Sequence, residues 1–271
     1  MPRADRTTGS RPDRRAGGSR RKPTSPPPTV IMLVRHGKTA TTGAKLPGRA
    51  PGLDLDDTGR RQAEDVAARI VRITTPAPDS PAGKAAAGVP GSNGRSPRSR
   101  GRSGGRRADG QATDGVAAVY SSPLERTRQT AEAIARAVGR DVQVDDGLIE
   151  LDIGEWTGMD LKDAMKRPEW TTIQRYPSGF TFPGGESFAA MQSRMVDTLA
   201  RLRARHPGET VVAVSHADPI RAVVAHAMGT HLDLFQRVVV SPCSLTVLSL
   251  ADTGPTVLAV NGTGDEPVVP A

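Results

Sequence analysis

The sequence predicts an α/β protein, arranged as a three-layer α/β/α sandwich around a mostly parallel central sheet. Two observations lead to this fold class. Short runs rich in β-branched residues alternate with longer stretches in which apolar residues recur every three or four positions. Two basic segments interrupt this alternation, and it fills nearly all of the remaining chain. Alternating strands and helices are typical of a sheet covered by helices on both faces.

Five apolar runs are expected to form the strands. The first, VIMLV, is followed at once by arginine and histidine, and the run VVAVS is also followed by a histidine. The expected strands are residues 30–34, 116–120, 211–215, 245–250 and 256–260.

Two helices are expected in the first half of the chain. The first begins near Thr58, with Asp57 or Thr58 as its N-cap. The second has Ser122 as its N-cap and a proline at its first position, and it ends at Gly139.

Two more helices are expected in the second half. The longer one spans residues 187–206, where apolar residues recur at spacings of three and four before Pro207 ends it. The other follows Asp218 as its cap and ends at Gly229. Together the four helices are enough to cover both faces of the sheet.

The positive charge of the chain is concentrated in two segments. Of the formal charge of +8, residues 1–29 carry +6 and residues 74–114 carry +4, so the rest of the chain sums to −2. Both segments are rich in Pro, Gly, Ser and Arg and lack apolar periodicity, which predicts disorder. We therefore expect one domain over residues 30–262, with a basic tail, a basic insertion and a flexible C-terminus at 263–271.

Composition also narrows the partners. The basic tail could bind polyanions through phosphate contacts, but it has no aromatic residues to stack on bases, so nucleic acid is not the expected partner. No apolar run approaches the roughly twenty residues that cross a membrane. Cys243 is the only cysteine, which favours a reducing cytoplasm and a thiol that packs in the core. The oligomeric state is left open.

Polar residues stand at the carboxyl ends of three expected strands. Arg35 and His36 follow the first, Ser122 follows the second with Arg126 one turn into the next helix, and His216 follows VVAVS. Ligands bind beyond the carboxyl ends of the strands in an open parallel sheet, so these residues are expected to share one crevice.

Such a cluster predicts an anionic ligand. Two arginines and two histidines in a partly desolvated crevice would repel one another unless a negative group lay between them. A phosphoryl group suits them, because arginine presents a planar fork of donors to phosphate oxygens. A single strand-end histidine is more often structural, so the prediction depends on the four residues together.

The sequence resembles the histidine phosphatase superfamily, also called the phosphoglycerate mutase-like family. Five stretches carry the resemblance in the family's order: VRHGKT, SSPLERTRQTAE, LIELDIGEWTG, FPGGES and VVAVSHADPIRAVVAHAMG. The resemblance implies the phosphoglycerate mutase-like fold, no cofactor and no metal. It implies that His36 becomes a phosphohistidine, that Arg35, Arg126 and His216 hold the phosphate, and that Glu150 is the proton donor.

Some positions depart from the family's pattern. Lys38 and Thr42 stand where a glutamate or glutamine and an asparagine are usual, and Thr42 can still donate a hydrogen bond to phosphate. The second histidine is more often followed by glycine in this family, whereas Ala217 and Asp218 follow it here. Asp152 and Glu155 are alternatives to the expected acid, although a surface loop often carries such residues for solubility.

The expected function is a metal-independent phosphatase that hydrolyses a small phosphomonoester through a phosphohistidine. The alternative is a phosphoglycerate mutase-like phosphomutase. Mutases of this family carry a long insertion with paired arginines between the acid and the second histidine, and here that stretch has Arg167, Arg175 and Arg194 but no adjacent pair. A phospho-ligand binder without activity is less favoured, because His36 and Glu150 are both present.

Overall fold

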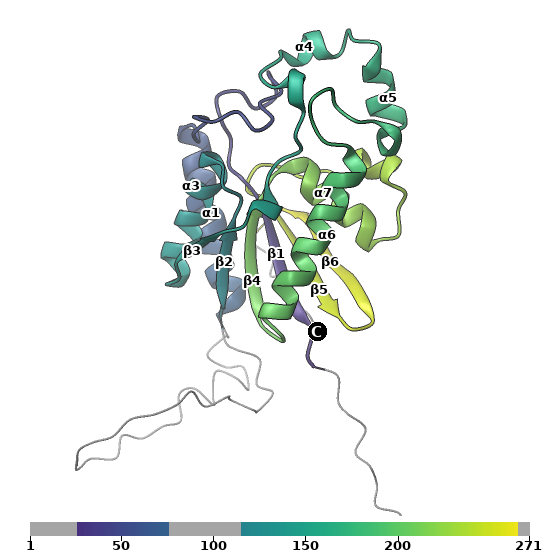
Figure 1. Cartoon of the computed structure of the whole chain (residues 1–271). Helices are drawn as coiled ribbons and strands as arrows, with labels where there is room; N and C mark the ends of the chain where they lie inside the picture. Colours follow the sequence, from purple (N-terminus) through teal and green to yellow (C-terminus); the bar gives the residue numbers. More distant parts are fainter. Residues whose placement is uncertain (1–25, 76–114, 265–271) are drawn as a thin grey trace, which may run out of the picture.

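The computed structural model describes residues 26–75 and 115–264, and the strands of this part form one sheet in its middle (Figure 1). The sheet has six strands in the order β3-β2-β4-β1-β5-β6. Their bounds are β1 Thr29–Arg35, β2 Ala118–Ser121, β3 Val142–Val144, β4 Thr210–Ser215, β5 Leu245–Ala251 and β6 Gly254–Gly262.

Strands β3, β2, β4 and β1 are mutually parallel, and β5 and β6 complete the sheet as an antiparallel hairpin beside β1. The predicted class, α/β with a mostly parallel sheet, is confirmed. Strand β3 was not expected, because three residues at a half-exposed sheet edge leave no apolar run in the sequence.

Helices cover both faces of the sheet. Helices α1 (Asp57–Thr74) and α3 (Glu125–Val138) lie on one face, and α6 (Phe188–Arg205) and α7 (Ala217–Ala227) lie on the other (Figure 1). Along β1, Met32 and Val34 pack into the core under α1 and α3, whereas Ile31 and Leu33 pack into the core under α6 and α7. Because strand side chains alternate in direction, one buried strand supplies both cores.

The helix boundaries follow the sequence, but several caps differ. Ser187 caps α6 as expected, and Gly139 ends α3 with a φ of 65°. The cap of α1 is Asp56, whose carboxylate accepts from the Gly59 N–H, rather than Asp57 or Thr58. The prediction that Asp218 caps α7 was wrong, because it lies inside the first turn of that helix.

Ser122 was also wrongly predicted to cap a helix. Helix α3 begins three residues later, at Glu125, and its N-cap residue Leu124 makes no side-chain capping bond. Pro123 therefore lies before the helix rather than at its first position. The Ser122 hydroxyl has a different partner, described below.

Above the carboxyl edge of the parallel strands lies a third apolar core. The chain's four phenylalanines pack there with Trp156, and the short helices α4 (Leu161–Ala164) and α5 (Glu169–Arg175) cover them (Figure 1). Neither helix was expected, because neither is long enough to show apolar periodicity. Four 3₁₀ turns complete the fold: η1 Asp146–Leu148, η2 Gly154–Trp156, η3 Pro177–Gly179 and η4 Leu232–Arg237.

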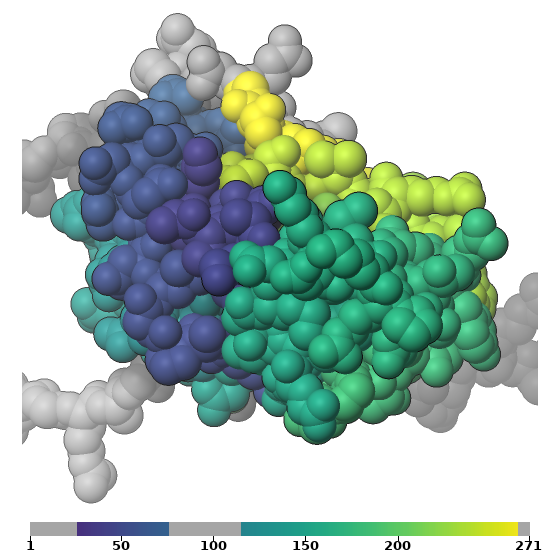
Figure 2. All heavy atoms as spheres, turned by 90° about the horizontal axis from the view of Figure 1, so that it is seen from above, coloured from purple at the N-terminus to yellow at the C-terminus, as the bar shows by residue number. Residues whose placement is uncertain are grey.

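Two segments, residues 38–55 and residues 157–185, meet beside this core. Lys45 bridges to Asp160, and Leu46 exchanges backbone hydrogen bonds with the 158–159 segment. In the view from above, the surface of residues 38–55 adjoins that of residues 157–185 (Figure 2). These backbone contacts fix the two segments against each other.

The expected disordered segments fall largely outside the described residues. Thr29 begins β1 and Thr74 ends α1, so both boundaries lie slightly inside the segments named from the sequence. The predictions for the basic tail, the basic insertion and the C-terminus otherwise remain untested. Within the described ranges, no helix combines the length and apolarity needed to cross a membrane.

The segment after β1 passes very close to the start of α1. A Cβ on Gly59 would lie 2.0 Å from the Lys38 carbonyl oxygen, and one on Gly37 would lie 2.5 Å from the Gly59 carbonyl oxygen. Both contacts are with backbone, which cannot rotate away. The two glycines therefore fix the path of the chain immediately after His36.

We expect Gly59→Ala to lower the free energy of unfolding by about 1–3 kcal/mol, the usual cost of overpacking, because the 36–38 segment must move. Denaturant unfolding measures the change. Ala68→Ser, at an exposed position of the same helix, should stay within about 0.5 kcal/mol of the wild type. Equal stability of Gly59→Ala and the wild type would contradict this close approach.

Candidate active site

The pairing of the strands brings the sequence-predicted residues together. Arg35 and Ser215, the last residues of β1 and β4, are direct partners, and β2 runs parallel along the other side of β4. The backbone N–H of His36 donates to the Ser215 carbonyl at 3.0 Å. His36, Ser122 and His216, which follow these strands, therefore meet at one edge of the sheet.

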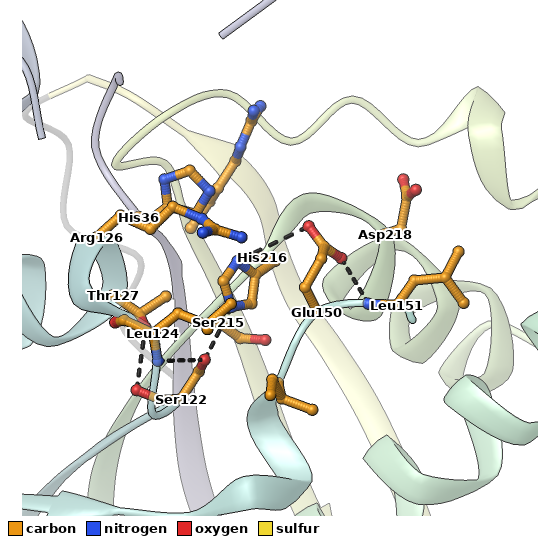
Figure 3. Close-up of polar contacts among 12 residues, drawn as sticks. His36, Ser122, Leu124, Arg126, Thr127, Glu150, Leu151, Ser215, His216 and Asp218 are labelled. Atoms are coloured by element: carbon orange, nitrogen blue, oxygen red, sulfur yellow. Dashed lines mark hydrogen bonds and ion pairs between the residues drawn. The ribbon is translucent and has the colours of Figure 1, made fainter. Parts of the chain in front are cut away.

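Two imidazole rings lie close together at this edge of the sheet (Figure 3). The centroids of His36 and His216 are 5.2 Å apart and their planes are inclined by 62°. His36 Nδ1 lies 2.7 Å from the Gly37 carbonyl oxygen, which can only accept, so Nδ1 carries the proton of the neutral ring. The other nitrogen, Nε2, then has a free lone pair and can act as a nucleophile.

His216 is fully buried, and its ring is hydrogen-bonded on one side. Its Nε2 lies 2.9 Å from the Ser122 hydroxyl, and its Nδ1 lies 3.7 Å from a carboxylate oxygen of Glu150 (Figure 3). Ser122 was predicted to cap a helix, and its hydroxyl instead lies within hydrogen-bond distance of the His216 ring. The contact with Glu150 brings the expected acid next to the expected phosphate ligands.

Both arginines of the site have unused donors, although Arg35 is only partly buried. Arg126 is fully buried, and one of its terminal N–H groups donates to the Gly48 carbonyl at 2.8 Å. Arg35 donates to the Val240 carbonyl at 2.7 Å. Within the described residues, Nε and Nη1 of Arg126 and Nε of Arg35 have no hydrogen-bond partner. Buried donors without partners are costly, so the crevice suits a ligand with several acceptor oxygens.

Burial and positive charge keep both histidines neutral. Burial lowers the pKa of His36 to about 3, and the guanidinium groups of Arg126 and Arg35 contribute in the same direction. The pKa of His216 is also lowered well below the usual value, again chiefly by burial and then by Arg126. A neutral imidazole is the nucleophilic form, so His36 is available over most of the pH range.

The carboxyl group of Glu150 is perturbed in the opposite direction. Burial, and after it the negative charge of Asp218, raises its pKa to about 7, although Arg126, the Leu151 N–H and Arg35 oppose the rise. Its side chain is 18% exposed, and one oxygen accepts from the Leu151 N–H at 2.9 Å. A carboxyl group with a pKa near neutrality can both donate and accept a proton.

The alternative acids lie elsewhere. Asp152 accepts from Arg49 at 3.3 Å and from the Gly154 N–H at 3.0 Å, and Glu155 is exposed. The Thr42 hydroxyl accepts from the Thr39 N–H at 2.9 Å and lies 3.0 Å from the Thr39 hydroxyl, in a local turn. Its expected role as a phosphate ligand stays a prediction.

Several contributors to the site were not predicted. Gly48 holds Arg126, Asp218 acts on Glu150, and Arg49, Glu186 and Arg194 surround the backbone of Glu150. Glu186 and Asp218 lie inside the motifs that carried the resemblance, so the sequence contained a signal for them. Gly48 and Arg49 lie in a loop without periodicity, and only the tertiary contacts reveal their roles.

Other reactive side chains do not add to the site. In residues 26–75 and 115–264, no group of three or more His, Cys, Asp or Glu side chains is placed to hold a metal ion. Cys243 is buried in the core under α1 and α3, as expected, and burial raises the pKa of its thiol to about 12. Such a thiol is protonated at neutral pH and is a poor nucleophile.

Comparison with known proteins agrees with this geometry. The family model of the histidine phosphatase superfamily (branch 1) matches residues 31–78 and 99–263. Phosphoserine phosphatase 1 of Hydrogenobacter thermophilus is 36% identical over 147 residues, covering 53% of this chain and 69% of that protein. A bifunctional protein of Mycobacterium tuberculosis is 38% identical over 152 residues, which are 55% of this chain.

The match to the mycobacterial protein covers less than half of that protein. The chain spans 42% of the length of the bifunctional mycobacterial protein. Among solved structures, a mycobacterial glucosyl-3-phosphoglycerate phosphatase superposes with a TM-score of 0.64 at 20% identity, covering 86% of this chain and 99% of that one. At this identity the superposition shows a shared fold.

The raised pKa of Glu150 is directly testable. Removing the charge of Asp218 removes one cause of the rise, so Asp218→Asn should move the Glu150 titration from about 7 to lower pH. Carboxyl ¹³C NMR of the protein measures the midpoint, and Glu150→Gln assigns the resonance. Asp163→Asn, in α4, serves as the matched control. A Glu150 midpoint that Asp218→Asn leaves unchanged would contradict the proposed electrostatics.

Proposed function

The chain belongs to the histidine phosphatase superfamily (branch 1), and from that premise we propose that it is a metal-independent phosphatase acting on a small phosphomonoester through a phosphohistidine at His36. The observation that carries the proposal is the buried Arg126 guanidinium, with two unpaired N–H groups, beside two neutral imidazoles. A phosphoryl group supplies the acceptors that these donors lack.

In the first step, the phosphoryl group is transferred to the enzyme. Arg35 and Arg126 bind its oxygens, and Nε2 of His36 attacks phosphorus as the ester P–O bond breaks. Charge spreads over the phosphoryl oxygens in the loose transition state, and the two guanidinium groups stabilise it. Protonated Glu150 gives its proton to the departing alkoxide, which leaves as an alcohol.

In the second step, water releases the phosphate. The Glu150 carboxylate takes a proton from a water molecule, whose oxygen attacks phosphorus as the P–N bond to His36 breaks. Inorganic phosphate leaves, and both side chains return to their starting states. Dividing hydrolysis into two transfers at one nucleophile replaces one difficult step with two easier ones.

The structure gives less support to the phosphomutase alternative. The arginines between the acid and the second histidine do not form a pair for a substrate carboxylate: Arg167 stacks over Trp156 at 5.3 Å, Arg175 is exposed, and Arg194 binds the backbone near Glu150. Within the described residues, none of them contacts the two histidines. A mutase would need other groups to hold its substrate.

The relatives' names suggest which esters to try. A metal-independent phosphoserine phosphatase of Arabidopsis thaliana is 29% identical over 203 residues, which are 72% of this chain and 67% of that protein. Phosphoserine, glucosyl-3-phosphoglycerate and 3-phosphoglycerate are therefore the first candidates. The reaction is expected in the cytoplasm, and the basic tail is expected to be dispensable for it.

We expect wild-type protein to hydrolyse p-nitrophenyl phosphate, and at least one of these esters, in the presence of a chelator. His36→Ala should abolish turnover, because the nucleophile is gone. Wild type quenched during turnover of a ³²P-labelled ester should carry an acid-labile phosphoryl group at residue 36. His226→Ala, which removes an exposed histidine of α7, is the matched control and should leave turnover unchanged.

The same assay separates the alternatives. Phosphoryl exchange between positions of phosphoglycerate without net release of phosphate would favour the mutase. Turnover that requires an added metal, or that survives His36→Ala, would overturn the proposal. With alkyl esters, kcat/KM should fall as pH rises through about 7, because deprotonated Glu150 cannot protonate the leaving oxygen.

A further inference from the structure

An ion-pair network of Glu186, Arg49 and Arg194 contacts the backbone of the segment that carries Glu150. One carboxylate oxygen of Glu186 accepts from Arg49 at 2.9 Å and from Arg194 at 2.5 Å. All three side chains are mostly buried, with exposures of 19% for Glu186, 29% for Arg49 and 22% for Arg194. Partial burial gives such a network more weight than an exposed ion pair has.

Other donors of both arginines bind the backbone that carries the acid, whereas Arg194 Nε is buried without a hydrogen-bond partner among the described residues. Arg49 Nε donates to the carbonyl of Glu150 at 2.8 Å, and Arg194 Nη1 donates to the carbonyls of Ile149 and Gly147 at 2.9 and 2.8 Å. The segment that bears the acid lies between η1 and η2 and belongs to neither a helix nor a strand. Its position therefore depends on these side-chain contacts.

The turn that presents Glu186 is fixed against the same segment. The Glu186 N–H donates to the Asp152 carbonyl at 2.9 Å, and its carboxylate accepts from the Asp152 N–H at 3.2 Å. A Cβ on Gly185 would lie 2.3 Å from the Asp152 carbonyl oxygen, so only glycine allows this approach. Glu186 is thus held directly behind the acid.

The network also reaches the phosphate-binding arginine. Gly48 accepts from Arg126 through its carbonyl, while the next residue, Arg49, binds the Glu150 carbonyl through its side chain. One dipeptide thus contacts both the cation for the phosphoryl group and the backbone of the acid. It couples the positions of the two.

We propose that Glu186 is a positioning residue: by clamping Arg49 and Arg194 it fixes the Glu150 carboxyl group at the distance from the phosphoryl site that proton transfer to the leaving oxygen requires. This inference rests on the proposed function. Misplacing a catalytic group by about 1 Å can cost about a hundredfold in rate, so a loose Glu150 should be a poor acid.

The leaving group tests this role. p-Nitrophenolate is a weak base that departs without a proton, whereas an alkoxide requires one, and kcat/KM reports formation of the phosphohistidine. Glu186→Gln keeps the shape of the side chain but removes its charge. We expect it to lower kcat/KM about 10- to 100-fold for an alkyl phosphate such as phosphoserine, and less than about threefold for p-nitrophenyl phosphate.

Two further variants complete the comparison. Arg194→Lys replaces the two separate nitrogens that bind the Gly147 and Ile149 carbonyls and Glu186 with a single nitrogen. It should show the same selective loss, and it replaces Glu186→Gln if that variant does not fold. Asp252→Asn removes the carboxylate partner of Arg203, another arginine of α6, and should leave both substrates unaffected.

A double-mutant cycle separates positioning of Glu150 from any other effect. In a Glu150→Gln background, Glu186→Gln should cause no further loss on the alkyl ester, because the group that it positions is gone. Equal losses on both esters, no loss on either, or an additive loss in the cycle would overturn the inference. Absence of a phosphohistidine in the wild type would instead refute the proposed function.

Discussion

The arrangement of the proposed active site depends on a buried guanidinium group whose hydrogen-bond donors are not all paired. Arg126 is fully buried and donates to the Gly48 carbonyl, and two of its nitrogens have no partner among the described residues. Nothing in the packing of the core requires such a group, and a buried charge with unpaired donors is destabilising. Its presence makes sense if an anion completes its shell, and that requirement orders the neighbouring residues around a phosphoryl group.

Burial and the neighbouring charges shift the pKa values of His36 and Glu150 in opposite directions. Burial and the two arginines keep His36 neutral, as the proposed nucleophile must be, while burial and Asp218 hold the pKa of Glu150 near neutrality, as its proposed role of acid and base requires. The sheet makes this possible. Since β1 and β4 end in register, residues 36 and 216 stand together although 180 positions separate them in the chain.

The sequence predicted the features that show apolar periodicity or stand at the ends of strands. It missed the features that depend on single tertiary contacts. Apolar runs predicted every strand except β3, and helical spacing predicted all four long helices of the described residues. The positions directly after the strands pointed to Arg35, His36 and His216. The Ser122 cap failed because its hydroxyl bonds to His216, and neither propensity nor spacing records that competition. Likewise, the loop that holds Arg126 and the Glu150 backbone has no pattern, since its contacts span about a hundred positions.

Calorimetric titration with inorganic phosphate tests the central claim most directly, with thermal unfolding measured in parallel for wild type and Arg126→Met. The account predicts one phosphate per wild-type chain, no measurable binding to the variant, and a phosphate-free variant at least as stable as the wild type, because an unpaired buried charge has been removed. Undiminished phosphate binding to Arg126→Met, or a large loss of its stability without phosphate, would contradict it.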